Sequence, residues 1–119
     1  MFIDWQYTAY GKGVADIVFL MIESLDVQHL HQWEGLLKEY YYIKLCEHAN
    51  AATYRRDAYE ADYLAAICHF PFFVAMWFGT APQEDLIDPN FPFFFVQRYF
   101  GFLDAHRGEL EPFLASLKE

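Results

Sequence analysis

The sequence LAAICHFPFFVAMWFG, residues 64–79, is the most apolar part of the chain, and His69 is its only polar side chain. A second segment, FPFFFVQRYFG at residues 91–101, repeats its FPFF, followed by Val and then by two aromatic residues and Gly. Phenylalanine rings bury a large apolar area when they pack together. We therefore expect these two Phe-rich segments to lie against each other in the middle of a single core.

The composition predicts one folded domain over residues 1–119. A chain of this length buries more than half of its unfolded surface without disulfides or metals. Hydrophobic residues make up 55% of it, too many for a disordered chain. Seventeen acids against eight bases give a net charge of −9. Phosphate binding needs a basic surface, so we do not expect direct nucleic-acid binding and expect basic proteins as partners.

The sequence predicts a cytoplasmic protein without a membrane span. The first residues, MFIDWQY, lack the basic and continuously apolar parts of a signal peptide. Residues 64–79 fall short of the ~20 apolar residues that span a bilayer, and Pro71 interrupts them. Cys46 and Cys68 form no CxxC motif and are predicted to be free thiols in the core.

Apolar residues recur with a helical period, which predicts an all-α fold: a single compact bundle of five to six helices with an aromatic-rich core. At Pro71 the chain either bends or starts a new helix. Gly108 is expected to separate the last two helices. The predicted helices cover residues 14–25, 27–49, 54–79, 92–106 and 109–117, with a long loop at 80–90.

The second of these helices has Asp26 as its expected N-cap. Among Tyr40, Tyr41 and Tyr42 at least one must be at the surface, because neighbouring residues on a helix point about 100° apart. The inner face of this helix is predicted to carry Val27, Leu30, Trp33, Leu37, Tyr41, Leu45 and His48.

No metal or cofactor site is expected. CEH at residues 46–48 and CH at residues 68–69 supply two thiols and two imidazoles, the right number for zinc. Residues one or two apart on a helix diverge by about 100° or 200°, so neither pair converges on one ion. The chain also lacks a CxxCH haem motif and a Gly-rich phosphate loop.

Two carboxylate–histidine pairs lie one helical turn apart, His31 with Glu34 and His29 with Asp26. A carboxylate can orient a histidine as a general base. The interpretation that we favour is a helix cap and a solvated ion pair, so no enzyme is predicted. The alternative is a small helical enzyme or cofactor-binding protein that uses buried histidines, with the candidates His31, His48 and His69.

Two patches combine carboxylates with aromatic or apolar side chains, as protein interfaces do. For the first, DAYEADY, a solvated face is the favoured interpretation because Arg55 and Arg56 are close to it. Its predicted partner-binding residues are Asp57, Tyr59, Glu60, Asp62 and Tyr63. Those of the second, EDLID, are Glu84, Asp85, Leu86 and Asp88.

In size, acidity, lack of a catalytic motif, and the DAYEADY and EDLID patches, the chain resembles small acidic bacterial immunity proteins. It is similar in particular to the helical ones of contact-dependent growth inhibition systems and to those found beside colicin-type nucleases. The resemblance implies an intracellular protein whose carboxylates cover the phosphate-binding cleft of a cognate basic toxin, without turnover. A third hypothesis is an adaptor subunit that forms a homodimer through exposed tyrosines and residues 91–95.

Overall fold

A computed structural model describes residues 11–48, 54–80 and 88–118, and the side chains of residues 70–80 are outside this description. These residues form five α-helices and no strand, so the prediction of an all-α fold is confirmed. The helices are α1 (Val14–Ser24), α2 (Val27–His48), α3 (Arg56–Thr80), α4 (Phe91–Ala105) and α5 (Arg107–Ser116).

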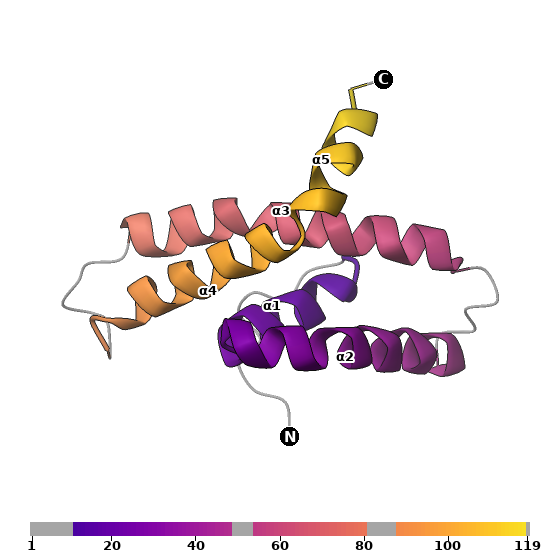
Figure 1. The fold of residues 1–119 in the computed structure, drawn as a ribbon, viewed down its shortest axis with the longest axis horizontal. Coiled ribbons are helices and arrows are strands. Elements are labelled where there is room, and N and C mark those ends of the chain that lie inside the picture. The colour runs from indigo at the N-terminus through magenta and orange to yellow at the C-terminus, as the bar shows by residue number, and fades with distance from the viewer. Residues whose placement is uncertain (1–10, 49–53, 81–87, 119) are drawn as a thin grey trace.

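The helices lie in two groups, with α3 and α4 on one side and α1 and α2 on the other (Figure 1). The most extensive contacts between helices join α1 to α3. Beyond its junction with α4, α5 points away from the other helices (Figure 1). In this arrangement, one side of α2 and the inner angle between α4 and α5 are two separate parts of the molecular surface.

The first two helices begin where the sequence predicts. In α1 the buried residues Val14, Val18, Met21 and Ile22 follow the helical period. In α2 Asp26 is the N-cap, because its Oδ1 accepts a hydrogen bond of 2.9 Å from the backbone N–H of His29.

Helix α3 continues through Pro71 as one element, so of the two alternatives predicted there the start of a new helix is wrong. A proline inside a helix removes one backbone hydrogen bond and costs about 3 kcal/mol. Its neighbours, Phe70 and Phe72, belong to the same apolar run. The local rule therefore predicts an interruption at Pro71 that the helix does not show.

The break between the last two helices lies two residues before Gly108, the residue at which it was predicted. Pro92 lies in the first turn of α4, where a missing N–H costs nothing. His106, at φ −100° and ψ 6°, separates α4 from α5. Gly108 lies inside α5, so its predicted role as the separator is wrong.

The buried core draws on all five helices, and its position is only partly as predicted. The Tyr99 hydroxyl on α4 donates to the Ile67 carbonyl on α3 at 3.1 Å, which joins the two Phe-rich segments. Phe93 and Phe100 are exposed, however, because consecutive residues on a helix cannot all face inward. The core consists of Val14, Val18, Met21, Ile22, Leu30, Tyr59, Tyr63, Ala66, Ile67, Phe95, Tyr99, Phe102 and Leu110.

Helix α2 approaches α4 closely at Gly101. A Cβ at this position would lie 2.5 Å from Cγ2 of Val27, a distance that no real Cβ contact sustains. The glycine therefore sets the spacing between the start of α2 and the second half of α4.

Candidate functional site

Two residues of the DAYEADY patch are inside the protein. Tyr59 and Tyr63 are both 0% exposed, so the prediction that they are partner-binding residues is wrong. They lie one turn apart on the inner face of α3, and their hydroxyls bond inward to the carbonyl of Lys38 and the carboxylate of Glu34. The tyrosines are core residues with satisfied hydroxyl groups.

The three acids of this patch are held by bases within the chain. Asp57 accepts two hydrogen bonds from Arg55, of 2.6 and 2.9 Å, which lower the pKa of its carboxyl. Glu60 and Asp62 are paired in the same way. Their partners are Lys38 and Arg56 for Glu60, and Lys12 and the Tyr54 hydroxyl for Asp62. The negative charge of the patch is thus largely compensated.

Only one of the predicted EDLID residues lies among the described residues. Glu84, Asp85 and Leu86 lie outside them. Asp88 is exposed, and its Oδ1 accepts a hydrogen bond of 2.8 Å from the backbone N–H of Asn90. Asp88 therefore shapes the entry into α4.

The predicted histidine candidates are all at the surface. His31, His48 and His69 are exposed, so these three candidates are not the buried histidines on which the enzyme alternative relies. Within the described residues, no group of three or more His, Cys, Asp and Glu side chains could hold a metal ion. Both cysteines are free thiols, as predicted.

The buried histidine is His106, and it completes a polar cluster at the junction of α4 and α5. Its Nε2 lies 2.5 Å from Oε1 of Glu34 on α2. The Tyr63 hydroxyl donates to the same oxygen at 2.6 Å. Neither ring nitrogen makes a directed hydrogen bond in the described part of the chain, and the contact with Glu34 is an ion pair when the ring is protonated. Glu109 approaches the other nitrogen, Nδ1, at 3.5 Å.

In this cluster, Glu34 and His106 each shift the pKa of the other in the direction that favours its charged form. Burial alone would lower the pKa of His106, but Glu34 outweighs it and raises this pKa above the ordinary 6.5. Burial alone would raise the pKa of Glu34, but His106 and Tyr63 lower it. Burial and the neighbouring carboxylate raise the pKa of the Tyr63 hydroxyl, which therefore keeps its proton and donates. The cluster is a buried ion pair with an added hydrogen bond.

Stability should depend on pH through this pair. The contribution of His106, whose pKa is raised, is fully present below pH 6.5 and is lost as the pH rises through its folded-state pKa. The contribution of Glu34, whose pKa is lowered, is present above pH 4.5 and is lost as the pH falls through its folded-state pKa. Urea unfolding across pH 4 to 9 should give a smaller alkaline decrease for His106→Gln than for the wild type. Parallel curves would contradict the assignment.

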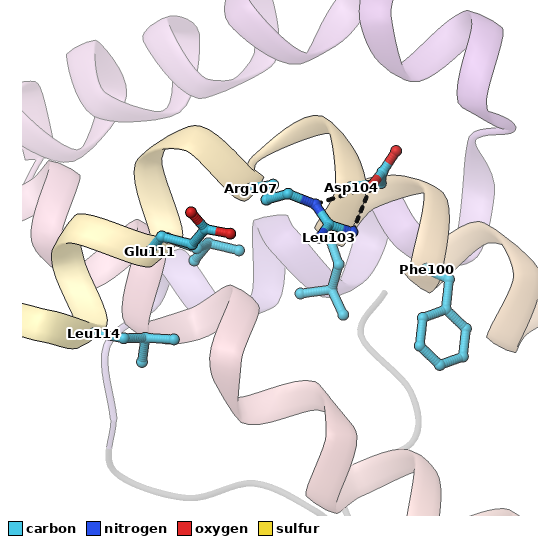
Figure 2. Close-up of a pocket in the computed structure, with 7 residues that line it drawn as sticks. Phe100, Leu103, Asp104, Arg107, Glu111 and Leu114 are labelled. Carbon is cyan, nitrogen blue, oxygen red and sulfur yellow. Dashed lines mark hydrogen bonds and ion pairs between the residues drawn. The ribbon is translucent and has the colours of Figure 1, made fainter.

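A hollow of about 450 Å³ lies at the inner angle between α4 and α5. Phe100 and Leu114 stand at its two ends, and Arg107 reaches across to Asp104 (Figure 2). The positions recur at helical spacing on both sides of the break at His106. We call this surface the α4–α5 hollow, and its residues are Phe100, Leu103, Asp104, Arg107, Leu110, Glu111 and Leu114.

The α4–α5 hollow has an apolar interior and a charged rim. Leu110 is buried, whereas Phe100 and Leu114 are 62% and 45% exposed. On the rim, Arg107 is engaged by Asp104 at 2.9 Å, which leaves Glu111 as the uncompensated charge of the lining. Such a surface can accept an apolar side chain flanked by a base. Sequence reasoning missed it, although the helical spacing of its residues was a readable signal.

No family model matches the chain, and no curated protein or solved structure matches it at a significant level. Among the described residues, no helix combines the length and the apolar character needed to cross a membrane.

Proposed function

We propose that this protein is a non-catalytic inhibitor of the immunity class, which binds and neutralises a basic protein toxin such as a nuclease. The observation that carries the proposal is the α4–α5 hollow: an apolar surface with one uncompensated carboxylate, Glu111, on its rim, in a chain of net charge −9. Apolar side chains exposed around a hollow and rimmed by polar residues are a feature of interaction sites.

The proposal moves the interface away from the DAYEADY patch. There the acids are paired with bases and the tyrosines are buried, so little charge or apolar area remains for a partner. At the α4–α5 hollow an apolar anchor of the toxin would enter between Phe100 and Leu114, and a neighbouring Lys or Arg would meet Glu111. Apolar anchors supply most binding energy, and complementary charges speed association.

The proposal also concerns the location of the protein in the cell and its domain organisation. The partner is a protein, and we infer a cytoplasmic location, where a toxin that enters the cell would be met. We further infer that residues 1–119 act as one domain, a single compact bundle. Limited proteolysis that leaves the chain uncut over its length would support the last point.

Leu114→Lys should abolish protection against the toxin. The substitution places a positive charge in the apolar wall that receives the anchor, and we expect the dissociation constant to rise at least tenfold, about 1.4 kcal/mol. Basic proteins encoded beside this chain would be expressed with it, with growth of the host and isothermal titration as the measurements. Binding should also weaken with salt, because it depends on opposite charges.

Leu20→Lys is the matched control, because Leu20 on α1 is similarly exposed at 52% and lies outside the α4–α5 hollow. It should protect as well as the wild type does. If the two variants lose protection equally, or if no basic neighbour binds, the proposed function is wrong.

A further inference from the structure

Helix α2 carries a row of exposed apolar side chains on the side that faces away from the core. Trp33, Leu36, Tyr40 and Ile43 are 42%, 60%, 60% and 45% exposed. We call these four residues the α2 seam. Tyr40 is the surface tyrosine that the YYY run predicts, whereas Trp33 was expected to face inward and does not.

The α2 seam has the spacing of a helix-pairing surface. Its residues follow one another at intervals of three, four and three, which is the spacing of the a and d positions of a heptad. It extends over about 15 Å of helix, at 1.5 Å per residue. In Figure 1, α2 lies along the edge of the molecule, and no other labelled helix lies beyond it.

We infer that the α2 seam pairs with the α2 seam of a second copy of this chain, with the two helices antiparallel. The spacing is self-complementary. When the two helices cross at residue 38, Trp33 lies opposite Ile43 of the second copy, and Leu36 lies opposite Tyr40. A large side chain thus faces a smaller one in each pair, as a two-fold symmetric interface requires.

The charges at the two ends of the α2 seam favour this orientation. One end carries Asp26 and His29, 2.9 Å apart, and the other carries Lys44 and Glu47, 2.6 Å apart. An antiparallel arrangement places Glu47 opposite His29 of the second copy. A parallel one would place Lys44 opposite Lys44 and Glu47 opposite Glu47, and like charges facing each other destabilise an interface.

The same charges argue against a basic protein as the occupant. Lys44 and Glu47 cancel, so the end of the α2 seam that carries them has no excess of acid to select a cationic partner. The pairing is therefore independent of the toxin binding proposed for the α4–α5 hollow.

Sedimentation equilibrium from about 1 to 500 µM tests the pairing, since a short helical interface corresponds to a dissociation constant in the micromolar range. The average mass should approach twice the 14.1 kDa of the chain. Salt should strengthen the dimer, because it screens repulsion between two acidic chains, whereas it should weaken toxin binding. A monomer throughout this range would overturn the inference.

Leu36→Lys should raise the dissociation constant of the dimer at least tenfold, while Leu117→Lys should leave it unchanged. Leu117 is 66% exposed at the end of α5 and outside the α2 seam. Both changes are at exposed positions, and circular dichroism would verify that each variant is folded. Equal effects of the two variants, or no effect of Leu36→Lys, would overturn the inference.

Mixtures of charged variants test the orientation. Trp33→Glu and Ile43→Lys should each be monomeric alone and should associate when mixed, because residues 33 and 43 face each other in the antiparallel pair. Trp33→Glu mixed with Leu36→Lys should not associate, since these positions lie about 10 Å apart along the antiparallel pair. The reverse pattern would overturn the antiparallel arrangement.

Discussion

Replacing Phe102 by alanine should lower the free energy of unfolding by about 4 kcal/mol, because a fully buried ring leaves a cavity that its neighbours fill only in part. Phe102 is 0% exposed and lies between the helices. Its ring centroid is 6.5 Å from that of Tyr63 on α3 and 4.9 Å from that of His106. Urea unfolding followed by far-UV circular dichroism measures the loss.

Phe100→Ala provides the comparison on the same helix. Phe100 is exposed, and its removal should cost less than about 1 kcal/mol. A similar loss for both substitutions would mean that the core does not have the position described here. Loss of partner binding by Phe100→Ala without loss of stability would, in turn, support the α4–α5 hollow as a binding surface.

Replacing Glu34 by alanine should cost about 3 kcal/mol, because it leaves the His106 ring without its counterion inside the protein. The two side chains are 14% and 8% exposed, so water replaces little of the lost interaction. The Tyr63 hydroxyl also loses its acceptor, at 2.6 Å in the wild type. The loss would be measured by urea unfolding at pH 6, where the ion pair is formed.

A double-mutant cycle separates the pair from its surroundings. Once Glu34 is gone, His106→Ala should cost much less than it does in the wild type, because its main partner is already missing. Tyr63→Phe, which removes only the hydroxyl, should cost about 1 kcal/mol. Additive losses for Glu34 and His106 would contradict the ion pair.

The periodic parts of the sequence predict the fold well. The residues that recur every three or four positions in α1 are those that are buried, and Asp26 caps α2 as its side chain predicts. These features depend on neighbours within one or two helical turns, which a sequence displays directly.

Helix α2 shows where such reasoning fails. Its inner face contains Leu30, Glu34 and Tyr41. The spacing of apolar residues predicted Trp33 on this face and the charged Glu34 on another one. Glu34 is acceptable inside because His106 and Tyr63 satisfy it. His106 and Tyr63 are both far from Glu34 in the sequence, so no local pattern predicts these contacts. One unrecognised ion pair therefore explains both the misplaced tryptophan and the missed buried cluster.

The DAYEADY patch and the α4–α5 hollow also differ in how far the sequence alone predicts them. From the sequence, the carboxylates at residues 57–62 were interpreted as an unpaired acidic patch. The bases that neutralise Glu60 and Asp62 include Lys38 and Lys12, which come from other parts of the chain. The α4–α5 hollow, by contrast, is built from residues close in sequence. The prediction placed the break at Gly108 and started the last helix at residue 109, so Arg107 was not assigned to either helix.

The contact between Gly101 and Val27 makes position 101 intolerant of any side chain at all. Alanine is the better helix former by about 1 kcal/mol, yet a methyl group would collide with Val27, a β-branched side chain whose χ1 rotamers are restricted in a helix. If codon 101 were randomised and the folded variants were recovered by protease selection, glycine should dominate the survivors. In a Val27→Ala background alanine should join it, because the obstructing methyl groups are then gone.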